Sequence, residues 1–229
     1  MNYDRQIFMM HFAKTSPALR LRVVSSNTLN RKVCKQRRKA GEEDKGKHLT
    51  LLSLSFHPSA ARELIVEIKK LTDKPVRYVV NTHFHWDHYQ GNQAYPASWP
   101  AGVEIISSEA TRNSIEKRGI PRVKHEIVTM PQEIERLKTD LAKATDAKQK
   151  AELQSNLTQA EAYLAELKTM QLTLPTMTFD RSLIVRRKSR TVQILWLGRA
   201  HTDGDVFVFL PKEKVLITGD RFMVGTFYG

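Results

Sequence analysis

The stretch that most constrains this chain is NTHFHWDHYQG, residues 81–91, which gathers three of its eight histidines directly after the strand-like run VRYVV. A loop that leaves a strand can aim His83 and His85 at one point, and Asp87 and His88 follow closely enough to turn toward a second. Imidazole nitrogens and a carboxylate are typical zinc ligands, and imidazole also suits iron. We therefore interpret the stretch as a metal site, in preference to three unrelated surface histidines.

The residues around this stretch predict how it is held in the fold. A helix is expected at 59–71, with Ser59 as its N-cap and apolar residues at helical spacing. A buried strand follows at 76–81, and further strands are expected at 49–55 and 102–107. Because ligand sites in α/β folds lie at the carboxyl ends of strands, we expect the histidines at such an edge.

A second set of site residues comes from the C-terminal part of the chain, where hydrophobic residues recur with a period of two. This period predicts strands at 182–187, 191–197, 205–210 and 214–219. The loop GRAHTDGD carries His201 between the second and third of them, and Asp220 follows a glycine at the end of the fourth. An Asp after a Gly is more often a turn residue. Together with the first histidine cluster, the two residues indicate the second half of one metal site.

The segment 131–170 differs in kind, because it is highly charged and carries leucines at heptad spacing. A separate helix is predicted at 107–119, with Gly119 as its C-terminal stop. Pro131 is expected to begin the charged helix, which breaks weakly near 145–146. Two antiparallel helices are the simplest interpretation, and one continuous helix is the alternative. In either case we interpret the segment as a coiled-coil-like insertion into the fold.

Taken together, these motifs resemble those of the metallo-β-lactamase-fold hydrolases, a superfamily of β-lactamases, glyoxalase II thioesterases, lactonases and some nucleases. His83 to His88 match its HxHxDH motif, His201 its G-x-A-H-T loop and Asp220 its Asp after a strand. The resemblance covers about residues 56–229. It implies an α/β fold, an αβ/βα sandwich that is partial here, with the helical hairpin inserted.

The resemblance also implies a ligand set and a reaction. One zinc would be held by His83, His85 and His201, and a second by Asp87, His88 and the bridging Asp220. A metal-bound hydroxide would attack the carbonyl of an ester, thioester, lactone or amide, and Asp87 would orient it and carry its proton. One or two zinc ions are expected, with iron or manganese as alternatives.

The sequence departs from the family pattern at both ends. No histidine follows His201, so the last metal ligand of the family has no counterpart, and no Asp-containing turn precedes the helix at 59–71. We therefore expect an incomplete copy with a weakened second metal site. Besides the zinc hydrolase, two alternatives remain: a metal-binding but catalytically impaired member, and a nucleic-acid-processing member.

The charge of the chain is +13 and is uneven. Residues 1–55 contain 12 Lys and Arg against four acidic residues, a net charge of +8. We interpret 1–50 as a basic, irregular extension and 51–229 as the metallo-β-lactamase-like domain. Because the positive charge lies outside the motifs, we expect the partner to be a small-molecule substrate and not a nucleic acid. There is no apolar run of membrane-helix length and no visible signal peptide, so we expect a cytoplasmic protein, or a secreted one if its true N-terminus lies upstream.

Two further groups of residues lack an assigned role. Aromatic residues that flank the motifs either line an apolar pocket or pack the loops: Phe84, Trp86, Tyr89, Phe222, Phe227 and Tyr228. His57 and His125 have no partner motif, and both are expected to be structural.

Overall fold

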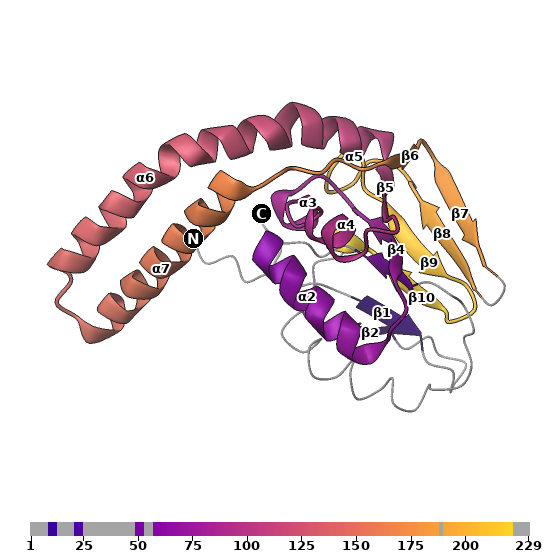
Figure 1. Ribbon diagram of the computed structural model, residues 1–229, viewed down its shortest axis with the longest axis horizontal. Coiled ribbons are helices and arrows are strands. Elements are labelled where there is room, and N and C mark those ends of the chain that lie inside the picture. The colour runs from indigo at the N-terminus through magenta and orange to yellow at the C-terminus, as the bar shows by residue number, and fades with distance from the viewer. Residues whose placement is uncertain (1–8, 13–20, 25–48, 53–56, 188–189, 222–229) are drawn as a thin grey trace.

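In a computed structural model, which describes residues 9–12, 21–24, 49–52, 57–187 and 190–221, two sheets lie face to face (Figure 1). The first sheet is parallel, with the strand order β3-β4-β5-β6. Its strands are β3 (Leu49–Leu52), β4 (Val76–Val80), β5 (Glu104–Ser108) and β6 (Met177–Phe179). The strands predicted at 49–55, 76–81 and 102–107 are therefore confirmed, although 53–56 lie outside the described residues.

The second sheet is antiparallel, with the order β2-β1-β10-β9-β8-β7. Its strands are β1 (Met9–Phe12), β2 (Leu21–Val24), β7 (Ser182–Arg186), β8 (Thr191–Leu195), β9 (Phe207–Leu210) and β10 (Val215–Ile217). The four strands predicted beyond residue 180 are confirmed, and all four are shorter than expected. The expectation that residues 1–50 are irregular is wrong for β1 and β2, because β1 pairs with β10 and so extends the sheet.

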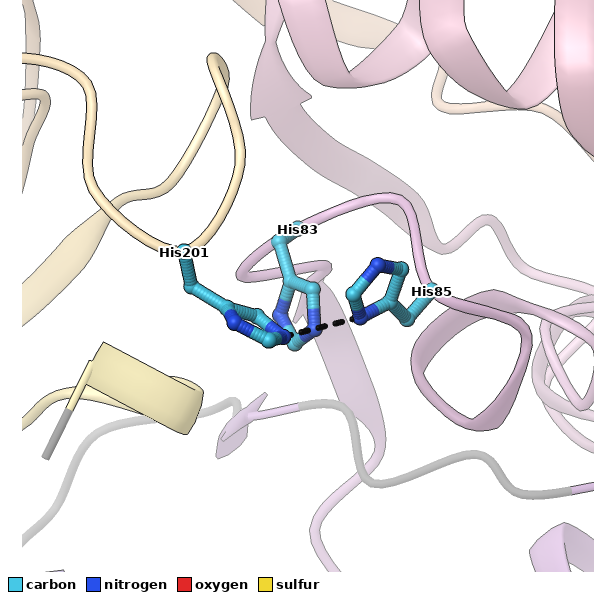
Figure 2. Close-up of side chains that lie close together, drawn as sticks. All are labelled: His83, His85 and His201. Carbon is cyan, nitrogen blue, oxygen red and sulfur yellow. Dashed lines mark hydrogen bonds between the residues drawn. The ribbon is translucent and has the colours of Figure 1, made fainter. Parts of the chain in front are cut away.

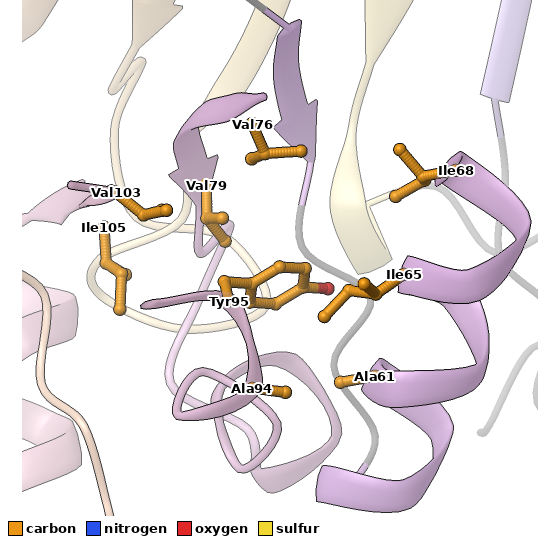
Figure 3. Packing of buried hydrophobic residues seen from close by; sticks show 9 residues of the cluster. All are labelled: Ala61, Ile65, Ile68, Val76, Val79, Ala94, Tyr95, Val103 and Ile105. Atoms are coloured by element: carbon orange, nitrogen blue, oxygen red, sulfur yellow. The ribbon is translucent and has the colours of Figure 1, made fainter. Parts of the chain in front are cut away.

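A helical layer covers the outer face of the parallel sheet (Figure 3). It consists of α2 (Pro58–Leu71) and α4 (Ala94–Ser98), which follows the short helix α3 (Trp86–Tyr89). Ala61, Ile65 and Ile68 of α2 pack with Tyr95 of α4 against buried strand residues such as Val79. The helix predicted at 59–71 is confirmed, but its N-cap is His57 and not Ser59, because Pro58 takes the first helical position that suits its fixed φ.

A second core fills the space between the two sheets. Val80 and Ile106 from the parallel sheet meet Val192, Ile194 and Val208 from the antiparallel one, and all five are buried. The layers therefore run helix, sheet, sheet. The predicted α/β class is confirmed, as part of the αβ/βα sandwich.

The long helical arm begins earlier than the sequence predicted. α5 (Glu109–Ser114), the π-helical turn η1 (Ile115–Gly119) and α6 (Ile120–Lys143) form one continuous run. The predicted stop at Gly119 is wrong, because its φ of −66° is helical. The predicted start at Pro131 is also wrong. Pro131 lies inside α6, and we attribute its tolerance to apolar contacts of the hairpin that offset the lost backbone hydrogen bond.

The hairpin itself has the predicted antiparallel form. α6 ends near the expected break, and α7 (Ala147–Thr169) begins after Asp146, whose side chain accepts a hydrogen bond from the amide of Gln149. Apolar residues of both helices pack along the seam: Met130, Ile134, Leu137, Leu141, Leu157, Ala160 and Leu164. Figure 1 shows the far end of the hairpin projecting away from the sheets. Within the described ranges, every helix is too short or too polar to span a membrane.

Candidate metal centre

The histidine loop leaves the end of β4 and folds back on itself through one buried asparagine. The amide nitrogen of the Asn81 side chain donates to the carbonyl oxygen of His88 at 2.6 Å and to Asn92 Oδ1 at 3.0 Å. The backbone N–H of Asn81 donates to the carbonyl of Ile106 on the neighbouring strand at 2.9 Å. These bonds fix the loop and the helix α3, which carries Asp87 and His88, against the end of the parallel sheet.

The loop that carries His201 is tied to the same sheet end at Gly204. The hydroxyls of Ser108 and Thr111 both donate to the carbonyl oxygen of Gly204, at 2.6 and 2.9 Å. A Cβ at position 204 would lie 2.4 Å from Thr111 Oγ1, so only glycine allows this approach. The N–H of Val206 donates to the carbonyl of Thr82 at 2.9 Å, which joins the two loops.

Asp220 is delivered by a second glycine, at the end of β10. Gly219 has a φ of +57°, a conformation that disfavours any other residue. A Cβ there would also lie 2.8 Å from Thr82 Oγ1. Both constraints explain why the sequence places a glycine immediately before this carboxylate.

Three histidines come together in the first group of candidate ligands (Figure 2). His201 Nε2 lies 3.0 Å from His85 Nδ1, and the ring of His83 lies beside both. One ligand atom from each of the three residues falls within 4.8 Å of the others. His83 is buried, His85 is half-buried and His201 is exposed, so this group opens to solvent on one side.

His83 also belongs to a second group, with His88 and Asp220. His88 Nε2 lies 3.5 Å from Asp220 Oδ1, and His83 Nε2 lies 3.7 Å from Asp220 Oδ2. On the other side of both rings, Thr82 Oγ1 lies 3.1 Å from His83 Nδ1 and 3.3 Å from His88 Nδ1. One hydroxyl thus orients two imidazoles so that both Nε2 atoms face the carboxylate, an outer-shell arrangement common around protein metals.

His83 provides the test of whether a metal ion fits this cluster. Its Nε2 is buried and has no hydrogen-bond partner within the described residues, since Asp220 lies beyond hydrogen-bonding distance. Burial, together with the neighbouring histidines, lowers the pKa of His83, so its imidazole is neutral and offers a lone pair. Buried polar atoms are rarely left unpaired in folded proteins. A cation bound at this point would satisfy Nε2, and the residues present therefore fit a metal ion.

The pKa shifts of His85 and Asp220 also fit a bound metal ion. Burial, and then His201, lowers the pKa of His85, which keeps its imidazole neutral. Burial alone would raise the pKa of Asp220, but the interaction of its carboxylate with His88 and the other neighbouring histidines outweighs burial and lowers the pKa. Unprotonated imidazoles at His83 and His85 and an ionised carboxylate at Asp220 are the protonation states that metal binding requires of these residues.

The structure places all six predicted site residues in one region. Five of them form the two groups just described, and Asp87 lies beside the second one, with its Oδ2 3.6 Å from His88 Nε2. His57 is engaged structurally, as predicted, because its Nδ1 lies 2.9 Å from Ser59 Oγ and 3.2 Å from Glu166 Oε2. His125 is instead exposed on α6.

Sequence reasoning missed the residues through which the helical hairpin holds the histidine loop. Buried Gln90 donates from Nε2 to the Tyr163 hydroxyl on α7 at 3.1 Å, and that hydroxyl donates to Glu126 Oε2 on α6 at 3.0 Å. Burial raises the pKa of Tyr163, so the phenol stays protonated and can donate. The rings of Trp86 and Tyr163 lie 6.0 Å apart. Trp86 and Tyr89 therefore pack the loop, and Phe222, Phe227 and Tyr228 lie outside the described residues.

Comparisons with known proteins agree with the motif. Residues 54–152 match the model of the Metallo-beta-lactamase superfamily. A curated relative, a linear primary-alkylsulfatase from a Pseudomonas species, is 26% identical over 163 residues, which cover 70% of this chain and 29% of the relative. The chain thus spans less than a third of that relative's length.

Solved structures also align with the chain. The metallo-beta-lactamase from Pontibacter korlensis is 14% identical, and its alignment covers 93% of this chain and 66% of that protein, with a TM-score of 0.45. The metallo-beta-lactamase from Hirschia baltica is 15% identical, and its alignment covers 74% of this chain and 52% of that protein, with a TM-score of 0.43. From the sequence matches, the resemblance to the metallo-β-lactamase superfamily is confirmed, over the segment 54–152 that contains the HxHxDH motif.

Proposed function

We propose that this chain is a metal-dependent hydrolase that binds its metal through His83, His85, His88, His201 and Asp220. The observation that carries the proposal is the buried, unpartnered Nε2 of His83, on which the other four side chains converge. The match of residues 54–152 to the model of the Metallo-beta-lactamase superfamily supports it, because the motifs resemble those of its metal-dependent hydrolases.

The ligand atoms favour zinc. They are imidazole nitrogens and carboxylate oxygens, which suit zinc and also permit iron or manganese. A metal ion held here would act as a Lewis acid and would lower the pKa of a water molecule toward neutrality. The exposed side of His85 and His201 is where substrate would approach, because the other face of the cluster is closed by Thr82 and the sheets.

Asp87 is the residue we propose for proton transfer. Its carboxylate lies beside His88 with about a fifth of its side chain exposed, so it can reach both the cluster and solvent. In this role Asp87 Oδ2 would accept a proton from the attacking water and deliver it to the leaving group.

Two substrate classes follow from different observations. The motif resemblance favours a carbonyl substrate, namely an ester, thioester, lactone or amide. The relative that acts on linear primary alkyl sulfates favours a sulfate ester as the second candidate. The cluster is compatible with either substrate class. A carbonyl carbon and a sulfate sulfur are both electrophilic atoms that carry an oxygen, and that oxygen could lie beside the metal.

Hydrolysis by the full chain tests the proposal. Zinc-loaded protein would be assayed with a p-nitrophenyl ester, a thioester, a lactone, nitrocefin and hexyl sulfate. We expect turnover of at least one substrate, abolished by a chelator and restored by zinc. His201→Ala should lower kcat/KM by about 100-fold or more, since it removes a metal ligand, and His125→Ala should not. Folded, zinc-loaded protein without turnover, or equal rates in both variants, would contradict the proposal.

A further inference from the structure

The π-helical turn η1 packs the start of the long arm against the histidine loop. Gly119, its last residue, sits against Tyr89, which is buried in the loop. A Cβ at position 119 would lie 2.5 Å from the Tyr89 hydroxyl oxygen, so glycine is needed for this close approach. Single π-helical turns are rare and are frequently found at functional sites.

This packing sets two arginines, one helical turn apart, over the two aromatic residues that flank His85. The guanidinium carbon of Arg118 lies 5.2 Å from the centre of the Phe84 ring, and that of Arg122 lies 6.0 Å from the Trp86 ring. The Phe84 ring in turn lies 5.0 Å from the ring of His85. A single aromatic ring therefore separates Arg118 from a candidate metal ligand.

The two arginines differ in how their charge is balanced. Arg122 Nε donates to Glu126 Oε1 at 2.7 Å, and Glu126 also accepts from Tyr163, so Arg122 belongs to the contact that holds the loop. Arg118 is exposed, and within the described part of the chain no carboxylate lies within ion-pairing distance of it. Stacking on Phe84 orients its guanidinium and leaves the N–H groups available.

We propose that Arg118 is a specificity-determining residue that binds an oxyanion of the substrate, a carboxylate or a sulfate, beside the metal centre. A guanidinium presents paired N–H donors that match two oxygens of either group. The proposal rests on the proposed function and adds to it a substrate class, an organic anion. The linear primary-alkylsulfatase that is similar in sequence acts on such an anion.

Binding of anions to the zinc-loaded full chain tests this without requiring turnover. Hexyl sulfate, hexanoate and neutral hexanol would be titrated calorimetrically into wild type, Arg118→Ala and Arg118→Lys. We expect Arg118→Ala to weaken the binding of at least one anion by about tenfold or more, as for the loss of a hydrogen bond to a charged group. The affinity for hexanol should not change, and the anion affinity of Arg118→Lys should lie between those of wild type and Arg118→Ala. The anion whose affinity falls more in Arg118→Ala identifies the group that Arg118 binds, either sulfate or carboxylate.

Lys117→Ala is the matched control, because it removes one exposed positive charge from the same turn. It should change anion binding by less than about threefold, as expected of a screened surface charge. Equal losses in Lys117→Ala and Arg118→Ala, or no loss in Arg118→Ala, would overturn the proposal. Absence of anion binding to wild type would also overturn it. Arg118-dependent anion binding without any hydrolysis would support it and would instead contradict the proposed function.

Discussion

The two halves of the candidate metal centre are built differently. His83 and His88 are almost completely buried, and both Nδ1 atoms meet the hydroxyl of Thr82. His85 and His201 lie on the solvent side, and His201 is exposed. The buried half is thus fixed by the sheet end before any metal binds, whereas the exposed half depends on two loops for its geometry. In the proposed function, the buried half would anchor the metal and the exposed half would meet the substrate.

Replacement of the one histidine shared by the two candidate ligand groups should have the largest effect. His83→Ala removes the only side chain common to the two candidate ligand groups. We expect zinc affinity to fall by more than about 100-fold, measured by competition with a chromophoric chelator. His125→Ala, on the exposed surface of α6, is the control and should bind zinc like the wild type. Equal affinities in the two variants would show that the cluster is not the metal site.

Single replacements in each half should separate metal binding from folding. His201→Ala and His88→Ala should each lower zinc affinity by about 10- to 100-fold, because each removes one ligand. Only His88→Ala should also destabilise the metal-free protein, by about 1–3 kcal/mol, because it empties a buried, hydrogen-bonded position. Thermal unfolding with a chelator present measures this. Equal loss of metal-free stability in both variants would remove the distinction between the halves.

The delivery of Asp220 can be tested at the glycine before it. Gly219→Ala would place a residue with a side chain at a positive φ and bring its Cβ onto Thr82. We therefore expect the free energy of unfolding to fall by about 1–3 kcal/mol and zinc affinity to fall about tenfold. Gly198→Ala is matched for positive φ but meets no atom within 4 Å. It should lose stability and keep its zinc affinity. If Gly198→Ala lost as much zinc affinity as Gly219→Ala, backbone strain alone would be enough to disturb the site.

The smallest effect is expected at the contact between the hairpin and the histidine loop. Tyr163→Phe keeps the ring and removes the hydroxyl that joins Gln90 to Glu126. Amide hydrogen exchange of residues 83–92 in the metal-free protein should accelerate, and zinc affinity should fall by about tenfold or less. Thr158→Val removes an exposed hydroxyl from the same helix and should change neither. Unchanged exchange in Tyr163→Phe would show that the loop does not depend on the hairpin.

The sequence was sufficient for those parts of the centre that local patterns encode. His83 to His88 follow a buried strand, and His201 and Asp220 lie beside glycines at strand ends, so their meeting could be predicted from short motifs. β1 and β2 could not be, because each has only four residues and the pairing of β1 with β10 joins opposite ends of the chain. The helix continues past Gly119 because that glycine serves a tertiary contact with Tyr89, which no local signal reveals. Tyr163 was missed for the same reason, since its partner Gln90 lies 73 residues away.

Zinc X-ray absorption tests whether imidazole nitrogens and a carboxylate of this one cluster hold a metal ion. Full-chain protein would be loaded with zinc, dialysed and measured beside His83→Ala. We predict retained zinc with nitrogen and oxygen neighbours at about 2.0–2.2 Å, imidazole scattering and no sulfur, and no retained zinc in the variant. Folded wild-type protein that keeps no zinc, or a sulfur neighbour near 2.3 Å from Cys34, the sole cysteine, would contradict that prediction.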